Sequence, residues 1–476
     1  MNNSSAGVAL SPAIIERVSA IVGRQHVLID ADQQLPYLRE WRELYQGRAG
    51  VVVRPGSTDQ VAEIMALANA HAIAVVPQAG NTGLVGGQLP FNGEILLSVG
   101  RLKRLRQVDA AGYTMTVEAG VTLAEAQAAA AAVDRLFPLS LASEGSAQIG
   151  GNLASNAGGA GVLAYGTARA LALGLEVVLA DGRVLPALST LKKDNSGYDL
   201  KHLFIGSEGT LGIITAATLR LFPRPAETAT AFVALADLER VLALFAAAAA
   251  AAGSSLTAFE FMPRLAIDFV LKHVANTRDP FATPAPWYAL IDVSGLKPDG
   301  SAERQMLAIL EAAAERGLIV DATLASSVAQ ARDFWRLRDL ISQAQKHEGG
   351  NVKNDVSVPI ASIPAFIARA DALVLGVCPA ARRLAFGHFG DGNVHYNIAQ
   401  PLAMPKAQFL ALWQPLQAAV NRAVLEFGGS ISAEHGIGVM KRDALMAAKS
   451  PVALDVMRAI KQALDPKGIL NPGKLL

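Results

Sequence analysis

The chain has 476 residues, a length at which a single core usually splits, so two or three domains are expected. Its 42 basic and 41 acidic residues leave a formal net charge of +1, which argues against nucleic acid or an anionic membrane as a partner. The single cysteine, Cys378, excludes an intrachain disulfide, a Cys-x-x-Cys redox centre and a cysteine-ligated zinc site. We therefore expect small-molecule chemistry in a reducing compartment, the cytoplasm.

The N-terminal segment, residues 1–47, is predicted to be helical. Ser11 followed by Pro12 is typical of a helix N-cap and first helical position, and the first residues lack the pattern of an export signal. The most apolar tract, residues 241–253, is shorter than the roughly 20 residues that a membrane-spanning helix needs. It is expected to be an alanine-rich helix of a protein that does not span a membrane.

The next region, residues 48–224, is predicted to be an α+β domain rich in glycine. Short apolar runs are typical of strands and alternate with a helical pattern. The strands are expected within residues 51–55, 74–78, 95–99 and 115–120, and the helix within residues 57–72.

Prolines at positions 223 and 225 mark a boundary, after which strand and helix patterns alternate again. Residues 225–425 are predicted to form a second domain, an antiparallel sheet covered by helices on one face. The last stretch, residues 426–476, is too short for a domain and is expected to pack back on the first one.

Three glycine-dense segments lie within the first domain, at residues 77–87, 144–159 and 206–215. Glycines let backbone N–H groups approach phosphate oxygens closely. The first segment has neither the Rossmann spacing nor the lysine of a Walker loop, and alone it would more often be a structural turn. Three such loops in one domain instead predict a long dinucleotide that touches all of them.

These loops resemble the FAD-binding (PCMH-type) domain of the vanillyl-alcohol oxidase superfamily. The resemblance implies two subdomains with FAD extended between them, bound non-covalently because the loops contain no histidine or cysteine. The implied cofactor contacts are Pro77, Gly80, Asn81, Thr82, Gly83, Leu84, Gly145, Ile149, Gly150, Gly151, Asn152, Asn156, Gly158, Glu208, Gly212, Ile214 and Asn471.

A turn signal at residues 390–393 predicts a hairpin that pairs His388 with His395. Directly opposed residues have Cβ atoms roughly 5 Å apart, so both imidazoles could reach one ion. Asn397 would lie on the same face as His395. The plainer alternative is a cross-strand polar pair with no metal.

Further along, Glu434 is followed by His435. A carboxylate beside two imidazoles would complete three ligands for zinc or a similar divalent ion, with one position open for substrate. The plainer reading of Glu434 is a helix cap. The segment 387–397 together with 433–436 resembles the C-terminal domain of the FAD-linked D-2-hydroxy-acid dehydrogenases, and the resemblance spans residues 48–476.

A site that selects among anionic substrates needs cationic side chains at defined positions. Arg338 and Ser342 are predicted to share one face of a helix, and Lys353 follows in a strand; the alternative is that both cations are solvated surface charges. D-2-hydroxyglutarate dehydrogenases have arginine, threonine and lysine at these positions, so this chain departs at Ser342. D-2-hydroxyglutarate or D-malate is expected, with D-lactate open.

The resemblance implies oxidation of a D-2-hydroxy acid to the 2-keto acid. A divalent metal would hold the substrate beside Arg338, Ser342, Lys353 and Asn397, and His435 would act as general base. The acceptor would be an electron-transfer flavoprotein or a quinone, and the protein a homodimer.

Three alternatives stay open at this stage. One is a metal-free flavin oxidase. The second is a D-lactate dehydrogenase or a glycolate-oxidase-like subunit. The third is a non-catalytic flavin-binding subunit.

Overall fold

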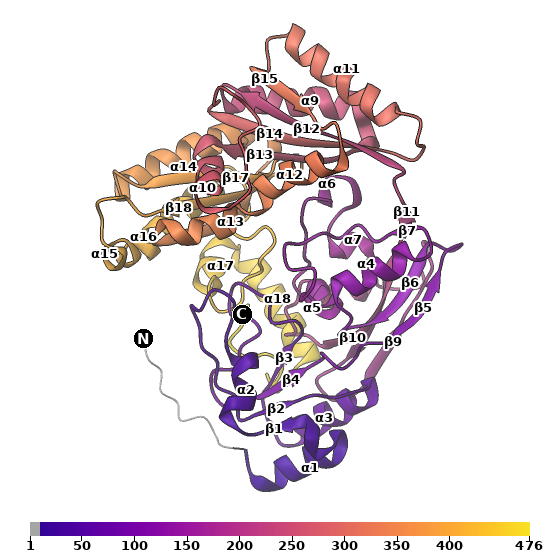
Figure 1. Ribbon diagram of the computed structural model, residues 1–476. Helices are drawn as coiled ribbons and strands as arrows, with labels where there is room; N and C mark the ends of the chain where they lie inside the picture. The colour runs from indigo at the N-terminus through magenta and orange to yellow at the C-terminus, as the bar shows by residue number, and fades with distance from the viewer. Residues whose placement is uncertain (1–9) are drawn as a thin grey trace. The chain divides into compact units, whose positions relative to one another are not determined.

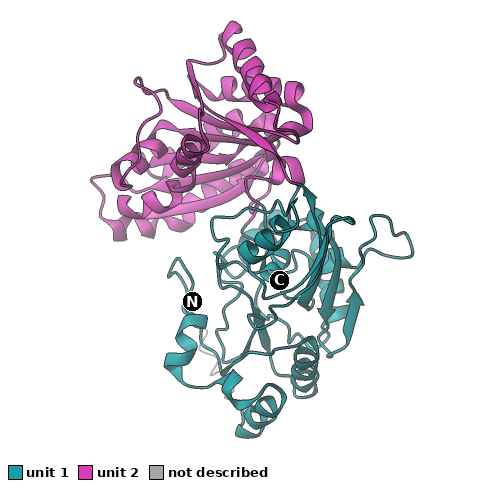
Figure 2. Cartoon of the chain, turned by 45° about the vertical axis from the view of Figure 1, so that its right-hand side comes forward, with its two compact units in different colours: residues 1–158, 166–223, 435–476 teal, residues 159–165, 224–434 magenta. Residues whose placement is uncertain are grey.

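The computed structural model describes residues 10–476, which divide into two compact units (Figures 1 and 2). Unit 1 combines the residues up to Gly158 with Gly166–Pro223 and His435–Leu476. Unit 2 combines Gly159–Tyr165 with Arg224–Glu434. The C-terminal stretch of the chain therefore belongs to the same unit as the N-terminal half.

Unit 1 begins with a helix where the sequence predicts one. Ser11 caps the first helix through its side chain, which accepts the N–H of Ile14. The N-terminal segment is not entirely helical, however, because a short strand, β1 (Val27–Leu28), pairs with β2 (Val51–Val53) at the edge of a sheet. The helices of unit 1 are α1 (Pro12–Val22), α2 (Ala31–Leu38), α3 (Thr58–Ala70), α4 (Leu123–Ala131), α5 (Ile149–Ala154), α7 (Ala168–Leu171), α8 (Lys201–Phe204), α17 (Arg442–Ala448) and α18 (Pro451–Leu464), with the 3₁₀ turn η1 (Arg24–His26).

Two main sheets form unit 1. In the first, of order β1-β2-β4-β3, the short apolar runs become largely buried strands, and β2 and β3 run parallel to β4. The second, of order β5-β6-β10-β8-β9, is antiparallel. The strands are β1 (Val27–Leu28), β2 (Val51–Val53), β3 (Val75–Gln78), β4 (Ile95–Ser98), β5 (Leu105–Asp109), β6 (Thr114–Glu118), β7 (Arg135–Leu136), β8 (Ala172–Val178), β9 (Val184–Ala187), β10 (Ile213–Arg220) and β11 (Phe222–Pro223).

The hydrophobic core of the first sheet explains why α1 and α3 form where they do. Each of these helices turns its apolar residues inward onto the strands, and the C-terminal stretch adds Ile469 and Leu470 to the same core. Leu470 also forms a parallel bridge with Val75 of β3. The end of the chain is thus built into the first sheet.

Unit 2 is a single antiparallel sheet of order β15-β12-β14-β13-β17-β18-β16. Its strands are β12 (Glu227–Leu235), β13 (Leu256–Pro263), β14 (Trp287–Gly295), β15 (Asp321–Leu324), β16 (Asn351–Ser357), β17 (Arg382–His388) and β18 (Asn393–Ala399). Its helices are α6 (Val162–Tyr165), α9 (Leu238–Ala252), α10 (Arg264–His273), α11 (Ser301–Glu315), α12 (Val328–Asp339), α13 (Ile341–Ala344), α14 (Ile363–Val377), α15 (Lys406–Ala411) and α16 (Trp413–Glu426). The 3₁₀ turns are η2 (Gly253–Ser255), η3 (Gln345–Glu348), η4 (Ile360–Ser362) and η5 (Phe389–Asp391).

The prediction that helices cover one face of this sheet is wrong, because they cover both. Helices α10, α12 and α13 pack on the face that carries Met262 of β13. Phe259, which precedes Met262 by three residues on β13, points to the other face. There it contacts the ring of Phe245 in α9. Alternate strand residues point to opposite faces, and both sets of β13 are buried, so each face needs its own helical layer.

Two described helical stretches, Leu238–Ser255 and Ile360–Val377, are apolar and long enough to cross a membrane by length and composition alone. Both include helices of the unit 2 core: α9 packs on β13, and α14 packs on α16. Core helices pass the same test of composition, so these two stretches are only a weak indication of a membrane span.

Candidate active site

Two histidines of the β17–β18 hairpin lie side by side, but not in the register that we predicted. His395 pairs with Phe386 rather than with His388. The turn is longer than expected, because η5 and then Gly392, at a φ of 83°, occupy it, and the ladder ends at the pair Phe386–His395. A shift of two residues keeps a side chain on the same face, so His388 and His395 still meet, with ring centroids 5.5 Å apart.

Glu434 joins the histidine pair and completes a set of three donors. The ligand atoms of His388, His395 and Glu434 all lie within 4.8 Å of one another. The Nε2 atom of His388 lies 3.3 Å from a carboxylate oxygen of Glu434. Two imidazoles and one carboxylate are the donor types of an open divalent zinc site. The residues present therefore fit a divalent cation of this kind.

A carboxylate lies behind each imidazole. The Oε1 atom of Glu260 is 2.6 Å from His388 Nδ1, and the Oδ1 atom of Asp355 is 3.8 Å from His395 Nδ1. Metal-ligating histidines commonly direct their second ring nitrogen toward such a carboxylate, which fixes the ring and its tautomer. The arrangement thus has the outer partners of a metal site as well as the donors.

Asp355 also orients the chain around the donors. It lies opposite His395 in the β16–β18 ladder. Its Oδ2 atom accepts the backbone N–H of Glu434 at 2.9 Å, and its Oδ1 atom accepts the side-chain amide of Asn393 at 2.9 Å. A single carboxylate therefore positions both the strand with one histidine and the loop with the glutamate.

Neighbouring charges separate the pKa values of the two histidines. Burial opposes protonation of His388, but the charge of Glu260 and its hydrogen bond outweigh burial and raise the pKa to about 10. Burial lowers the pKa of His395 to about 4. Burial also opposes ionisation of Glu260, yet Arg338 and His388 lower its pKa to about 2. This side of the sheet therefore carries ionised acids that favour a cation.

The guanidinium of Arg338 lies beside the histidine pair. Its Nε atom donates to Oε2 of Glu260 at 2.6 Å, and the side chain is only 11% exposed, so a solvated surface charge is the wrong description. The predicted continuous helix is also wrong: α12 ends at Asp339 and α13 begins at Ile341. Arg338 and Ser342 consequently belong to two successive helices.

The other residues predicted to bind substrate are connected by short contacts. Lys353 lies opposite Asn397 in the β16–β18 ladder, and its Nζ atom donates to the backbone carbonyl of Ser342 at 3.3 Å. The Asn397 amide donates to Oε1 of the buried Gln345 at 3.0 Å. The structure thus brings Ser342, Lys353 and Asn397 to one region of unit 2.

Three residues that position this site were missed from the sequence: Glu260, Asp355 and Gln345. The first two carried a signal, because each is an acidic residue within an otherwise apolar or alternating strand pattern. A buried strand accepts a charge only where a partner awaits it. Gln345 carried no comparable signal. His435 follows Glu434 directly and is the first residue of the last part of unit 1.

The predicted cofactor loops lie in unit 1, where close backbone packing requires their glycines. A Cβ atom at Gly80 would fall 2.0 Å from the carbonyl oxygen of Ser146, so the loop around Gly80 and Thr82 contacts the loop before α5. A Cβ atom at Gly151 would lie 3.0 Å from that of Ala79. The first two predicted cofactor loops are therefore neighbours.

Glu208 and Asn471 tie the third loop and the C-terminal stretch to the first loop. The Glu208 carboxylate accepts the backbone N–H groups of Ile437 and Gly438 at 2.7 and 2.8 Å. The Asn471 amide donates to the carbonyls of Gly87 and Glu208 at 3.0 and 2.7 Å. These contacts give both residues a structural role in holding the loops.

The remaining predicted contacts divide into packed and open positions. Ile149, Gly150, Asn152, Gly158, Gly212 and Ile214 are buried, Pro77, Asn81, Leu84 and Asn156 are partly exposed, and Gly83 is exposed. Within residues 10–476, no atom beyond the two neighbouring residues lies within 4 Å of a Cβ atom built at Gly145. Among the described residues, the buried atoms Gln148 Oε1, Asn152 Nδ2 and Asn471 Oδ1 have no hydrogen-bond partner. Unpartnered polar atoms beside such loops fit a polar cofactor such as FAD.

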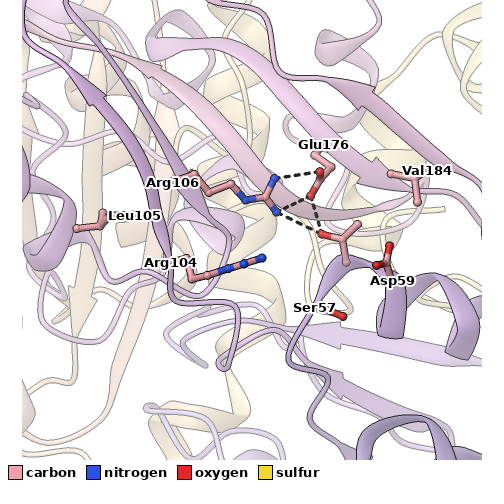
Figure 3. Close-up of a pocket in the computed structure, with 8 residues that line it drawn as sticks. Ser57, Asp59, Arg104, Leu105, Arg106, Glu176 and Val184 are labelled. Atoms are coloured by element: carbon pink, nitrogen blue, oxygen red, sulfur yellow. Dashed lines mark hydrogen bonds and ion pairs between the residues drawn. The ribbon is translucent and has the colours of Figure 1, made fainter.

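A separate pocket of unit 1, about 780 Å³ in volume, carries two arginines but does not form an anion site (Figure 3). Arg106 makes two hydrogen bonds to Glu176, at 2.9 and 3.0 Å, and Arg104 is paired with Glu118. Both positive charges are thus neutralised by acids. The charged residues of the pocket therefore form a network of ion pairs, which joins β5 to β6 and β8.

Comparison with known families agrees with both halves of the chain. Residues 49–187 match the model of an FAD binding domain, and residues 224–475 match that of the C-terminal domain of FAD linked oxidases. The chain belongs to the FAD-linked oxidases. It is an FAD-dependent oxidoreductase, as its glycine loops and its C-terminal motifs predicted.

Several curated relatives of this FAD-linked oxidase are similar over most of their length. A D-2-hydroxyglutarate dehydrogenase of Xanthomonas citri pv. viticola is 40% identical over 439 residues, covering 92% of each chain. The mitochondrial D-2-hydroxyglutarate dehydrogenase of Arabidopsis thaliana is 38% identical over 96% of this chain and 80% of its own. That of Bos taurus is 39% identical over 98% of this chain and 83% of its own.

Solved structures show the same fold at lower identity. A p-cresol methylhydroxylase with substrate bound matches with a TM-score of 0.77 and 17% identity, covering 97% of this chain and 96% of its own. The 4-ethylphenol oxidase of Gulosibacter chungangensis matches with a TM-score of 0.74 and 20% identity, covering 99% and 98%. At these identities the likeness shows the fold alone, and together with the two family models it confirms the predicted fold class, an FAD-binding domain joined to a C-terminal domain with an antiparallel sheet.

Proposed function

We propose that this FAD-linked oxidase oxidises D-2-hydroxyglutarate to the corresponding 2-keto acid, with a divalent metal held by His388, His395 and Glu434. The observation that carries the proposal is that these three donors lie within 4.8 Å of one another while Arg338 shares Glu260 with His388. A metal position and a cation for a carboxylate are therefore adjacent. The names of the relatives at 38–40% identity support the same substrate.

The basic residues account for a substrate with two carboxylates. Arg338 and Lys353 are the two cations among the predicted substrate contacts, and each contributes charge-assisted hydrogen bonds to a carboxylate. Ser342 keeps a hydroxyl, and Asn397 is held in place by Gln345. D-malate, a shorter dianion of the same configuration, is the second substrate that this pair of cations suits.

The chain would divide the work of the reaction among few residues. A bound divalent cation would lower the pKa of the C2 hydroxyl, and bound FAD would supply the two-electron acceptor. Arg338 and Lys353 would orient the acid, and Asn397 would hydrogen-bond it. His435 would accept the hydroxyl proton as general base. An electron-transfer flavoprotein or a quinone would then reoxidise the enzyme.

Steady-state assays with a dye acceptor test this proposal. Purified flavoprotein with saturating zinc is assayed with the D and L forms of 2-hydroxyglutarate, malate and lactate. We expect D-2-hydroxyglutarate to give the highest kcat/KM and the L forms to give none. Turnover of none of these acids, or full turnover after complete metal removal, would show that the proposal is wrong.

A further inference from the structure

One buried glutamate contacts both the metal-ligand histidine and the substrate arginine. Glu260 lies in the middle of β13, where it is 1% exposed. Its Oε1 atom is 2.6 Å from His388 Nδ1, and its Oε2 atom is 2.6 Å from Arg338 Nε. Each carboxylate oxygen therefore serves a different partner.

The sheet and one helix fix this arrangement. Glu260 and His388 are directly opposed in the β13–β17 ladder, so their side chains share one face. Arg338 comes from the last turn of α12, which covers the same face through Phe334 and Leu337. The carboxylate is thus held at the junction of two strands and a helix.

Because Glu260 is buried, the loss of either contact would be unfavourable in free energy. An isolated ionised carboxylate in the interior is strongly unfavourable, and it persists where hydrogen-bonded cations or N–H groups compensate it. Glu260 has such partners on both oxygens. Asp292, on the neighbouring strand β14, is partly exposed, and its carboxylate accepts hydrogen bonds from the neutral groups of Thr230 and Trp335. It touches neither His388 nor Arg338 by these bonds.

We propose that Glu260 is a positioning residue that couples the metal site to substrate binding, an inference that rests on the proposed function. By accepting the Nδ1–H of His388, it orients the ring so that Nε2 faces Glu434 and the metal position, and it leaves Nε2 as the nitrogen that would bind the metal. By accepting the Nε–H of Arg338, it leaves Nη1 of the guanidinium for a substrate carboxylate, while Nη2 lies 3.4 Å from His388 Nε2. One side chain thereby sets the geometry of both.

The substitution Glu260→Gln separates the two contacts because an amide has one acceptor and one donor end. If the amide oxygen faces Arg338, the amide N–H₂ faces His388 and favours the tautomer with the proton on Nε2, where the metal would bind. If the amide is reversed, its N–H₂ opposes the Nε–H of Arg338. Either orientation damages one contact, and exchange between the two damages both.

The experiment measures zinc affinity and substrate KM separately. Zinc dissociation constants are measured by competition with a chromogenic chelator for the wild type, Glu260→Gln and the control Asp292→Asn. KM and kcat for D-2-hydroxyglutarate are then measured at saturating zinc, so that a change in KM is not a loss of metal. FAD absorbance and thermal unfolding report whether each variant is folded.

We expect Glu260→Gln to weaken zinc binding by roughly 10- to 100-fold, the range found for outer partners of ligating histidines. We also expect it to raise KM by about 10-fold, with full FAD content. Asp292→Asn should stay within about two-fold of the wild type in both values. A folded Glu260→Gln variant with wild-type zinc affinity and wild-type KM would overturn the inference.

Two further outcomes keep the inference apart from the proposed function. If the wild type itself binds no zinc and oxidises no 2-hydroxy acid, the proposed function fails and the inference fails with it. If Glu260→Gln does not fold, Glu260→Asp is measured instead. This variant keeps the negative charge, but its side chain is shorter by one methylene group, so the carboxylate lies farther from both partners. We expect smaller losses of the same two kinds, and wild-type values in both would overturn the inference.

Discussion

Asp355 accepts the backbone N–H of Glu434 at 2.9 Å, and so fixes the loop that brings this carboxylate to His388 and His395. Removal of the Asp355 carboxylate should therefore weaken metal binding more than it weakens substrate binding by Arg338. We expect Asp355→Ala to weaken zinc binding by roughly 10- to 100-fold while KM at saturating zinc changes little. Asp355→Asn, which keeps an oxygen acceptor, should lose less. An equal loss in both variants would contradict the role of this hydrogen bond.

His388 is the donor with the shortest contact to an outer carboxylate, and it lies in unit 2, whereas the predicted FAD loops lie in unit 1. We expect His388→Ala to abolish turnover of D-2-hydroxyglutarate but to retain the visible absorbance of FAD. Chelator treatment of the wild type should have the same effect and be reversed by zinc. His347→Ala, at an exposed histidine of the same unit, serves as control and should keep activity. Substantial turnover by His388→Ala would show that it is not a metal ligand.

Lys353 should matter more for acids with a second carboxylate than for those without one. A charge-assisted hydrogen bond to a carboxylate contributes about 1.5–3 kcal/mol, or roughly a 10- to 100-fold effect. We expect Lys353→Met to lower kcat/KM for D-2-hydroxyglutarate by this factor and to change that for D-lactate much less. Lys406→Met, at an exposed lysine of unit 2, is the matched control. A parallel decrease for both acids would argue against contact with the distal carboxylate.

Gly80 lies where two of the predicted FAD loops meet. A methyl group at this position would fall 2.0 Å from the backbone oxygen of Ser146, which cannot move aside as a flexible side chain could. We expect Gly80→Ala to push the loops apart and to lower the FAD content of the purified protein at least tenfold, measured by the ratio of visible to ultraviolet absorbance. Gly376→Ala, in α14, should bind FAD normally, because no atom of the described residues outside the helix backbone lies within 4 Å of the added methyl group. Full occupancy in Gly80→Ala would place the cofactor elsewhere.

Glu348 predicts a specific dependence of stability on pH. Burial would raise its pKa, but hydrogen bonds from Lys272, Arg382 and His273 outweigh burial and lower the pKa to about 2. Because the folded pKa is below the unfolded value of about 4.5, the stabilisation is complete above pH 4.5 and is lost as pH falls toward 2.

At pH 7 we expect Glu348→Gln to lower the free energy of unfolding by about 2 kcal/mol, a value reduced for solvent screening because the Lys272 side chain is 63% exposed. Denaturant unfolding from pH 7 to pH 3 checks this prediction. The difference from the wild type should shrink below pH 4.5. A difference that is constant over this range would mean that the carboxylate charge is not its source.

The sequence predicted much of the fold because local patterns decide it. The capped helix after Ser11, the buried strands of the first sheet and the glycine loops all follow from neighbouring residues. The turn between β17 and β18 was not predicted correctly. Its 3₁₀ turn η5 and the left-handed Gly392 end the ladder earlier than a four-residue loop would. The two histidines met all the same, since the register shifted by an even number of residues.

The supporting residues of the site were harder to predict than its donors. Glu260 precedes Arg338 by 78 residues and His388 by 128, so no local spacing connects them. They meet only once β13 pairs with β17 and α12 packs on the same face. The break between α12 and α13 at Leu340 likewise carries no proline or glycine as a signal.

The placement of Asn471 has a consequence for the order in which the protein matures on the ribosome. Its amide joins Gly87 to Glu208, and Leu470 lies beside Val75 in the first sheet, so unit 1 needs residues from both ends of the chain. Unit 2, apart from seven residues, is continuous and is synthesised before those last residues emerge. The unit whose sequence is translated first is therefore completed last, because its first sheet and its glycine loops await the residues around Asn471.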